Sequence, residues 1–212
     1  MVTTSSVWQD TRTFFPLFLD ILSGRKVESA CVVGASDGKF VLPLARRGIR
    51  VLAVERDPLA LNGGQVTLPG QMGSTMPGLR QRLAAEGPSS LVEIVENNLL
   101  DMAAPAQPVD AIWTSCSWHY SVNRSRPLAD FIMAMIALCR PHGGLLGAEY
   151  MMPVEPRHLS VDHYPEQGEV RRFFRGWRID WETYTVPFLE APHVEQLTEH
   201  VHRMGLIIAT RP

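Results

Sequence analysis

The chain has 212 residues, a hydrophobic fraction of 45% and a formal net charge of −2 at pH 7. This length suits one domain that buries a sizeable core without help from disulfides or metals. Because the charge is close to neutral, nothing attracts nucleic acid or an anionic membrane electrostatically, and we expect neither as a partner. Composition gives no indication of the oligomeric state.

The three cysteines are Cys31, Cys116 and Cys139, which are far apart and lie in apolar runs. An odd, scattered set predicts neither a disulfide framework nor a zinc site, so we expect a reducing, cytoplasmic compartment. No apolar run approaches the ~18 residues of a membrane span. Residues 1–6 lack the basic start and apolar core of a signal peptide.

The first predicted element is a helix capped by Ser5 or Ser6. Its apolar residues, from Trp8 to Leu22, recur at helical spacing, and Gly24 ends it. We expect residues 1–25 to form an N-terminal helix that either packs on the domain or acts as a lid.

Strands and helices then alternate up to residue 150. Apolar runs predict strands over 27–33, 51–55, 91–95, 111–114 and 145–150, with helices over 38–47 and 127–140. A short helix over 166–174 and strands over 177–185 and 205–210 complete the chain. This order predicts an α/β fold: a doubly wound, mostly parallel sheet covered by helices on both faces. With no repeat or linker, residues 1–212 are expected to form a single domain.

Residues 63–78 carry many glycines and prolines. Such a density of helix and strand breakers predicts a long irregular loop, and its position places that loop beside the ligand site.

Ligands of such sheets bind beyond the carboxyl ends of the strands. Small residues from Gly34 to Gly38 follow the first strand and let the backbone approach a bulky ligand. Glu55 ends the second strand about 20 residues later, where a carboxylate accepts hydrogen bonds from ribose hydroxyls. The third strand is followed by Asn97 and Asn98, and the fourth by residues 115–120.

These segments resemble the S-adenosylmethionine (SAM) binding motifs of class I methyltransferases. The matching segments are Val33–Gly38, Val54–Glu55, Asn97–Asp101 and Val109–Trp113. Residues 169–177 and 202–212 are similar to the closing part of small tellurite-resistance-type and thiopurine-type methyltransferases. The resemblance implies a seven-stranded, Rossmann-like sheet, SAM as cofactor and a small-molecule substrate, in natural-product biosynthesis or detoxification.

Carried over by position, the resemblance assigns cofactor-binding residues in four segments. The turn would line the methionine and ribose of SAM, Glu55 and its neighbour Arg56 would meet the ribose, and the third-strand segment would meet the adenine. The complete set is Gly34, Ala35, Ser36, Asp37, Gly38, Glu55, Arg56, Asn97, Asn98, Leu99 and Ser115. The plain alternatives are that the glycines serve only the turn and that the asparagines cap a helix.

One position departs from the family pattern. Members usually carry an acid two residues before the first motif glycine, where it helps to hold the ammonium of SAM, and this chain has Val32 there. Ser36 also replaces the middle glycine. Either Asp37 or another polar group takes over the ammonium, or the amine is left without a carboxylate and its pKa falls.

Two reactions are possible, depending on whether the amine of SAM has a carboxylate partner. In the first, the sulfonium methyl passes to an external acceptor, with His119 as the candidate base and Tyr120 and Asn123 beside it. In the second, the amine of SAM attacks its own γ-carbon, as in the azetidine-2-carboxylate synthases, and expels methylthioadenosine. Aromatic rings would then hold the sulfonium, and the candidates are Trp8, Trp118, Tyr120 and Tyr150. A third possibility is a SAM-binding module without chemistry.

Several other side chains are expected to have structural roles. His119 can be a simple hydrogen-bonded histidine, and Asn123 can cap the following helix. Cys116 is expected to fill space rather than to act as a nucleophile. His193, His200 and His202 lack a matching acidic cluster in the sequence, which predicts no metal site.

Overall fold

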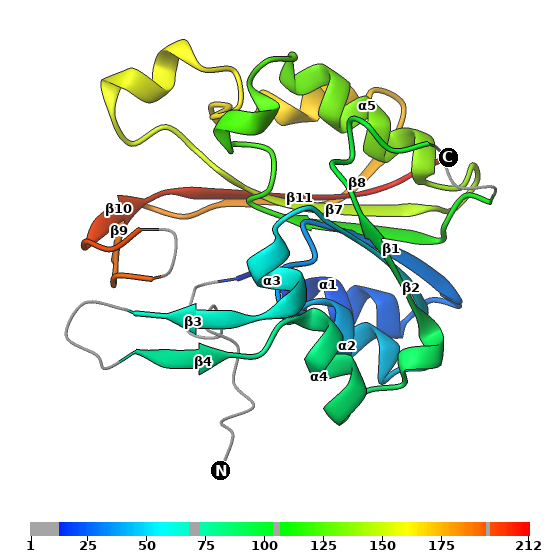
Figure 1. Ribbon diagram of the computed structural model, residues 1–212. Helices are drawn as coiled ribbons and strands as arrows, with labels where there is room; N and C mark the ends of the chain where they lie inside the picture. The colour runs from blue at the N-terminus through cyan, green and yellow to red at the C-terminus, as the bar shows by residue number, and fades with distance from the viewer. Residues whose placement is uncertain (1–12, 68–72, 104–106, 194–195) are drawn as a thin grey trace.

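The computed structural model describes residues 13–67, 73–103, 107–193 and 196–212. Within these ranges the central element is a seven-stranded sheet in the order β5-β2-β1-β6-β7-β11-β8 (Figure 1). The strands are β1 (Ser29–Val33), β2 (Arg50–Glu55), β5 (Val92–Glu96), β6 (Ala111–Ser115), β7 (Leu145–Met151), β8 (Arg178–Tyr184) and β11 (Met204–Thr210). β11 runs antiparallel to both of its neighbours, whereas the pairs from β5 to β7 are parallel.

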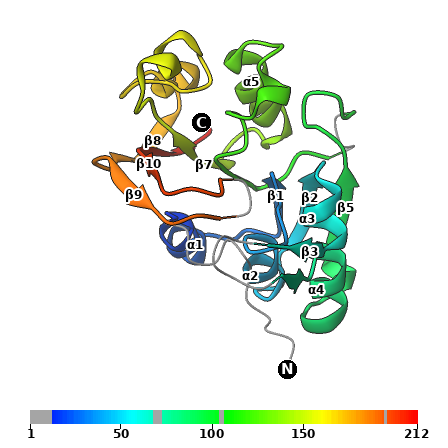
Figure 2. The same ribbon diagram turned by 60° about the vertical axis from the view of Figure 1, so that its left-hand side comes forward.

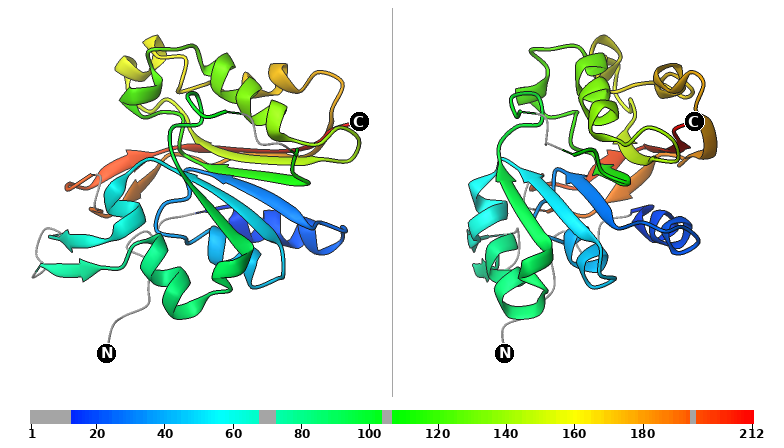
Figure 3. Two further views of the ribbon diagram at one scale, coloured as in Figure 1. Left: turned by 45° about the vertical axis from the view of Figure 1, so that its right-hand side comes forward. Right: turned by 90° about the vertical axis from the view of Figure 1, so that its right-hand side faces the viewer.

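Helices cover both faces of this sheet (Figure 3). The chain forms α1 (Phe15–Ser23), α2 (Val41–Ala45), α3 (Pro58–Asn62), α4 (Leu79–Glu86) and α5 (Leu128–Leu138). Side chains of β1 alternate between the two faces: Val32 packs with α1 and α2, and Val33 packs with α5. The sheet is therefore buried on both sides, and the prediction of a doubly wound, mostly parallel sheet is confirmed.

The face that carries α1 is built around Trp113 on β6. Its ring lies 4.9 Å from Phe18 and 5.1 Å from Phe15, between ring centroids. Gly147 on β7 allows this approach, since a Cβ there would lie 2.6 Å from the Phe18 ring. Phe15 and Phe18 thus serve the core, and α1 ends at Gly24 as expected. It begins only at Phe15, after the non-helical Thr13 and Phe14, and the predicted caps Ser5 and Ser6 lie outside the described residues.

Residues 63–78 differ from the prediction of an irregular loop. They contain an antiparallel pair, β3 (Gly64–Val66) and β4 (Ser74–Met76), in the register Gly64 to Met76. Among the described breakers, Gly63, Gly73 and Pro77 lie directly next to the ends of these strands. Gly63 adopts a φ of 71°, and a Cβ there would lie 2.4 Å from the Met76 carbonyl oxygen.

The last third holds a second pair that the sequence did not predict. β9 (Phe188–Glu190) and β10 (His200–His202) form an antiparallel hairpin in the chain segment that connects β8 to β11. Both hairpins extend past the same edge of the main sheet (Figures 1 and 2). The predicted helix over 166–174 is reduced to a 3₁₀ turn, Val170–Phe174, and further 3₁₀ turns occur at Ser89–Leu91, Ser121–Asn123 and Pro156–Ser160.

None of the helices in the described part of the chain has the length and apolarity needed to cross a bilayer.

Candidate functional site

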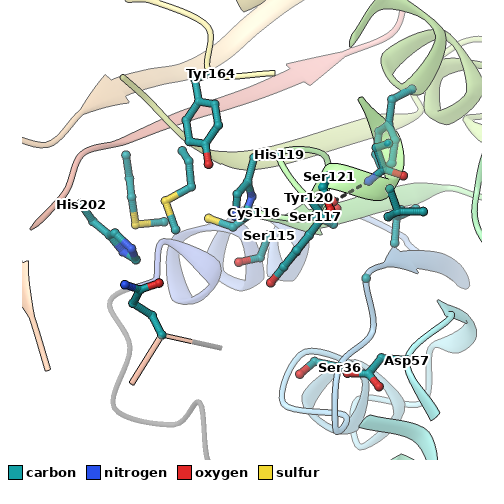
Figure 4. A pocket seen from close by; sticks show the side chains of 18 of the residues that line it. Ser36, Asp57, Ser115, Cys116, Ser117, His119, Tyr120, Ser121, Tyr164 and His202 are labelled. Carbon is teal, nitrogen blue, oxygen red and sulfur yellow. Dashed lines mark hydrogen bonds between the residues drawn. The ribbon is translucent and has the colours of Figure 1, made fainter. Parts of the chain in front are cut away.

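A cavity of about 560 Å³ opens beyond the carboxyl ends of β1, β2, β6 and β7. Its volume is typical of a small-molecule site. One wall comes from the turn after β1 and the end of β2, and the opposite wall from residues 115–123, the 151–164 segment and the β9–β10 hairpin. Figure 4 shows Ser36 and Asp57 on one side of this space, across from Ser115, His119 and Tyr164.

The turn after β1 has an unusual backbone. Gly34 has a φ of 72°, and a Cβ on it would lie 2.7 Å from Cβ of Ser117. Ser36 also has a positive φ, of 53°. The Gly34 and Ala35 amides donate to the Val54 carbonyl oxygen over 2.9 and 3.1 Å. The turn is thus tied to β2, and it brings Gly34 and Ser36 to the cavity.

Glu55 is held by three backbone amides at the cavity wall. Its Oε2 accepts from Ser36 over 2.8 Å, and its Oε1 accepts from Arg56 and Asp57 over 2.8 and 2.9 Å. A carboxylate offers about four lone-pair sites, so Oε2 keeps one for a ligand donor. Arg56 also lines the cavity. Asp57 caps α3 by accepting from the Leu59 amide over 2.9 Å.

Asp37 does not face the cavity. Its side chain has 0% exposure, and Oδ2 accepts a hydrogen bond from Nη1 of Arg82 over 3.1 Å. Asp37 therefore pairs with Arg82 and does not border the cavity, and its Oδ1 has no hydrogen-bond partner among the described residues. Gly38 and Ala35 are also buried, outside the cavity lining, and serve the turn rather than a ligand directly.

The two loops that follow β5 and β6 are joined through Asn123. Its Oδ1 accepts from Nδ2 of Asn98 over 3.0 Å, and its Nδ2 donates to the Ser117 carbonyl oxygen over 2.9 Å. Asn123 therefore positions both loops, and the expectation that it caps the next helix is wrong, since α5 has no side-chain cap. Asn98 Oδ1 caps the short turn after β5 through the Leu100 amide, over 3.1 Å.

Asn97, Asn98 and Leu99 all border the cavity, together with Asn123. Asn97 accepts the Asn98 amide through its own side chain over 2.8 Å. Both asparagines thus accept local backbone amides in a turn, and no helix follows them in the described residues before β6, so they do not cap one.

Ser115 donates to Glu149, which lies at the end of β7. Glu149 also accepts from the Thr13 hydroxyl over 2.9 Å and from the Phe14 amide over 2.6 Å. Burial raises the pKa of the Glu149 carboxyl, and the donors from Ser115, Phe14 and Thr13 oppose that effect. Glu149 thereby fastens the start of α1 to the strand edge at the site.

His119 lies on the cavity wall among aromatic rings. Its ring centroid is 4.4 Å from Tyr120 and 5.6 Å from Tyr164. Desolvation, and then the positive charge of Arg124, lower the pKa of His119 to about 3. The ring is therefore neutral at pH 7, and it is a weak base.

Two of the aromatic rings expected to contact a ligand belong to the core. Trp118 and Tyr150 are 1% and 0% exposed, and their centroids lie 5.3 Å apart. Neither borders the cavity within the described ranges, so the expectation that they face a sulfonium is wrong. Trp8 lies outside the described residues. Tyr120 does line the cavity.

Cys116 lines the cavity but is not activated. Burial, reinforced by the charge of Glu149, raises the pKa of its thiol well above the ordinary value. A protonated thiol is a poor nucleophile, which agrees with the prediction that Cys116 fills space.

Several lining residues escaped the sequence prediction. Tyr164 and His158 stack with a centroid distance of 4.3 Å and bring the 151–164 segment to the site. Lys39 also lines the cavity, and burial lowers its pKa while Glu149 and other acidic groups oppose that shift. The 151–164 segment carries no sequence motif. Only its position directly after the fifth predicted strand could have indicated that it borders the cavity.

The β9–β10 hairpin supplies the acidic residue that the sequence pattern did not show. Glu190 lies beside His193, His200 and His202 at the cavity. The prediction of no metal site rested on the lack of a matching acidic cluster, and Glu190 supplies one carboxylate beside the three histidines that the sequence did not indicate.

Several solved structures have a similar fold. TehB from Haemophilus influenzae is similar to 96% of this chain at 10% identity and a TM-score of 0.67, and the chain spans 65% of TehB. The fold is that of class I methyltransferases. No family profile matches the sequence, and no curated protein matches it either.

Two further structures carry a relevant ligand. Magnesium protoporphyrin IX methyltransferase (ChlM) from Synechocystis PCC 6803, with bound SAH, has a TM-score of 0.60 at 13% identity. The N-methyltransferase NodS from Bradyrhizobium japonicum WM9, in complex with S-adenosyl-l-homocysteine, has a TM-score of 0.61 at 13% identity. In each case 97% of this chain and 91% of the other chain are covered. At these identities the similarity establishes the fold.

Proposed function

We propose that the chain binds SAM in this cavity and transfers the sulfonium methyl to a small-molecule acceptor. The observation that carries the proposal is the Glu55 carboxylate, fixed by backbone amides at the end of β2 next to the Gly34 turn. Ligands of doubly wound sheets bind at this edge, and an acid at this point accepts ribose hydroxyls. The SAH complexes of NodS and ChlM support a sulfonium cofactor in this fold.

The cavity wall offers a group for each part of SAM. The backbone of Gly34 and Ser36 takes the methionine and ribose side, and the free lone pair of Glu55 takes a ribose hydroxyl. Leu99 and the asparagines before it border the adenine position. Tyr120 lies at the far side of the cavity, where an aromatic face stabilises a sulfonium by roughly 0.5–2 kcal/mol.

Methyl transfer at this site depends on positioning. A neutral His119 with a pKa of about 3 is a poor acceptor for a proton at pH 7. Alignment of acceptor and methyl group alone supplies roughly 7–11 kcal/mol of the barrier reduction. We therefore propose an acceptor that reacts without strong base catalysis, in natural-product biosynthesis or detoxification in the cytoplasm.

A second reaction has a specific observation in its favour. Position 32 carries an apolar valine buried in the core, and Asp37 is paired with Arg82 away from the cavity, so neither position supplies a carboxylate to the ammonium of SAM. An amine without a carboxylate partner has a lower pKa and is protonated less readily. After loss of a proton to water, its lone pair can attack the γ-carbon while the carbon–sulfur bond breaks. The products are azetidine-2-carboxylate and methylthioadenosine, with sulfur taking the bonding electrons.

One incubation separates the two reactions. Purified protein is mixed with SAM alone and analysed by mass spectrometry, and candidate acceptors are added in a second series. Methyl transfer predicts unchanged SAM in the first series and S-adenosylhomocysteine in the second. Ring closure predicts methylthioadenosine and the cyclic amino acid without any acceptor.

Binding is tested separately by calorimetry with SAM and with S-adenosylhomocysteine. The absence of binding at millimolar ligand would refute both reactions. Binding without product in either series would leave the chain a SAM-binding module and contradict the enzymatic proposal.

A further inference from the structure

The β9–β10 hairpin gathers a set of metal-ligand side chains. The hairpin cluster consists of Glu190, His193, His200 and His202, and one ligand atom from each lies within 4.8 Å of all the others. Glu190 is the register partner of His200, and His202 follows two residues later on the same face of β10. His193 reaches the cluster from the connection between the strands.

The distances within the cluster are short. The His200 centroid lies 4.3 Å from that of His202 and 5.0 Å from that of His193. Nδ1 of His202 lies 2.5 Å from Oε2 of Glu190. Three imidazoles thus face a single carboxylate. Imidazole nitrogens grouped around one carboxylate oxygen form a donor set that binds a divalent cation.

The tautomer of His200 is fixed by its backbone neighbour. Nδ1 of His200 lies 2.8 Å from the Thr198 carbonyl oxygen, which can only accept, so Nδ1 carries the proton. Nε2 therefore presents a lone pair, and it is buried without a partner among the described residues. A histidine that donates its other nitrogen to a backbone carbonyl is the usual support for a metal ligand.

We propose that the hairpin cluster binds one Zn²⁺ through Glu190, His193, His200 and His202. Zinc takes four ligands at about 2.0–2.2 Å in a tetrahedron, and nitrogen with carboxylate oxygen suits it. The edges of such a tetrahedron measure about 3.3–3.6 Å, so the ligand atoms close in from their 4.8 Å spread by a rotation of side chains.

All four positions of this zinc are taken by the protein. A site with no open position is structural and does not activate water. Both strands and their connection contribute ligands, so the ion joins the parts of the hairpin. Because the four residues also line the cavity, the ion holds this wall in place beside the ligand site.

The test uses full-length protein without a histidine tag, stripped of metal by a chelator. Titration with Zn²⁺ against a chromogenic chelator is expected to show one equivalent bound per chain and a higher midpoint of thermal unfolding. Co²⁺ in place of Zn²⁺ is expected to give the intense visible bands of a tetrahedral site.

His200→Ala and His202→Ala each remove a zinc ligand. Loss of a residue that only supports a ligand weakens metal binding roughly 10–100-fold, so these variants are expected to weaken Zn²⁺ binding by at least that factor. Glu190→Gln keeps the side-chain volume and removes the charged oxygen, so it gives a weakened site even if an alanine variant misfolds. The matched control is His142→Asn, at an exposed turn with a φ of 58° that asparagine tolerates. It is expected to bind Zn²⁺ as the parent does.

Two results would overturn the proposal. One is the absence of Zn²⁺ uptake by the parent protein, and the other is equal uptake by the parent and the cluster variants. Calorimetry with SAM on the metal-free protein is run in parallel, so a failure of the proposed cofactor site is seen separately from a failure of the zinc site.

Discussion

Nη1 of Arg82 on α4 donates to Oδ2 of Asp37 over 3.1 Å, and both side chains are almost excluded from solvent. This pair joins the turn after β1 to a helix 45 residues away. It also removes Asp37 from contact with a ligand. A buried carboxylate within the turn after β1 thus serves to hold that turn in shape.

Removal of one partner of this pair is expected to destabilise the protein strongly. Arg82→Leu leaves Asp37 buried without its counter-charge, which costs about 3–5 kcal/mol of the free energy of unfolding. The double variant with Asp37→Leu has no orphaned charge and is expected to recover much of that loss. Urea unfolding of the three proteins measures the effect. Equal stabilities of the single variant and the parent would contradict a buried ion pair.

Substitution of Glu55 tests the proposed ribose contact. Glu55→Ala is expected to weaken SAM binding by about 1–3 kcal/mol, because a charged hydrogen-bond acceptor is lost and the turn loses its three-amide anchor. Calorimetry with SAM measures the change. Glu93→Gln, an exposed carboxylate on the edge strand β5, is the control and should bind SAM as the parent does. Equal affinity of the Glu55→Ala protein would remove the ribose assignment.

The buried position of His119 predicts a dependence of stability on pH. Its pKa of about 3 in the folded protein lies below the ordinary value of 6.5, so the unfolded chain binds the extra proton between these limits. The contribution of His119 to stability is fully present above pH 6.5 and is lost as the pH falls toward 3. The slope attributable to this residue is up to about 1.4 kcal/mol per pH unit.

Urea unfolding at pH 7, 6 and 5 tests this slope. The difference between the parent and His119→Gln should shift in favour of the variant as the pH falls. His142→Asn serves as the comparison for a solvent-exposed histidine. A ring proton signal of His119 that titrates near pH 6.5 in NMR spectra would contradict the predicted neutral state.

The three cysteines are expected to resist alkylation in the folded protein. Desolvation raises the pKa of Cys31 and Cys139 to about 12, and it also raises that of Cys116. At pH 8 a thiol with a pKa of about 12 reacts roughly 10³-fold more slowly than an ordinary one, because the thiolate is the nucleophile. Mass spectrometry after iodoacetamide treatment is expected to find labels only after unfolding in guanidinium. Rapid labelling of Cys116 alone would show a reactive thiol at the cavity.

The sequence predicted the sheet well because its signals are local. The strands around Val33, Val54 and Ile112 are continuous apolar runs, as both faces of a parallel sheet are buried. The positions of Gly34, Ser36, Glu55 and Ser115 at the cavity followed from the rule that loops after parallel strands meet at one edge.

The errors concern side chains whose neighbours come from distant segments. Trp118 is an aromatic residue in a loop at the site, which is typical of a ligand contact. Its packing against Tyr150 and Phe131 shows that it is a core residue. Both hairpins were missed because strands of three residues carry too short a pattern to be recognised.

The sequence by itself determined the seven strands of the main sheet, the small-residue turn and the carboxylate at the end of β2, because periodicity and turn chemistry act between residues close in the chain. Only the tertiary structure decided that Arg82 neutralises Asp37, that Asn123 links two loops and that Glu190 joins three histidines at the cavity. These pairings depend on chain segments brought together by burial of the two apolar faces of the sheet, and charge pairing and hydrogen bonding act only across the short distances that such packing creates.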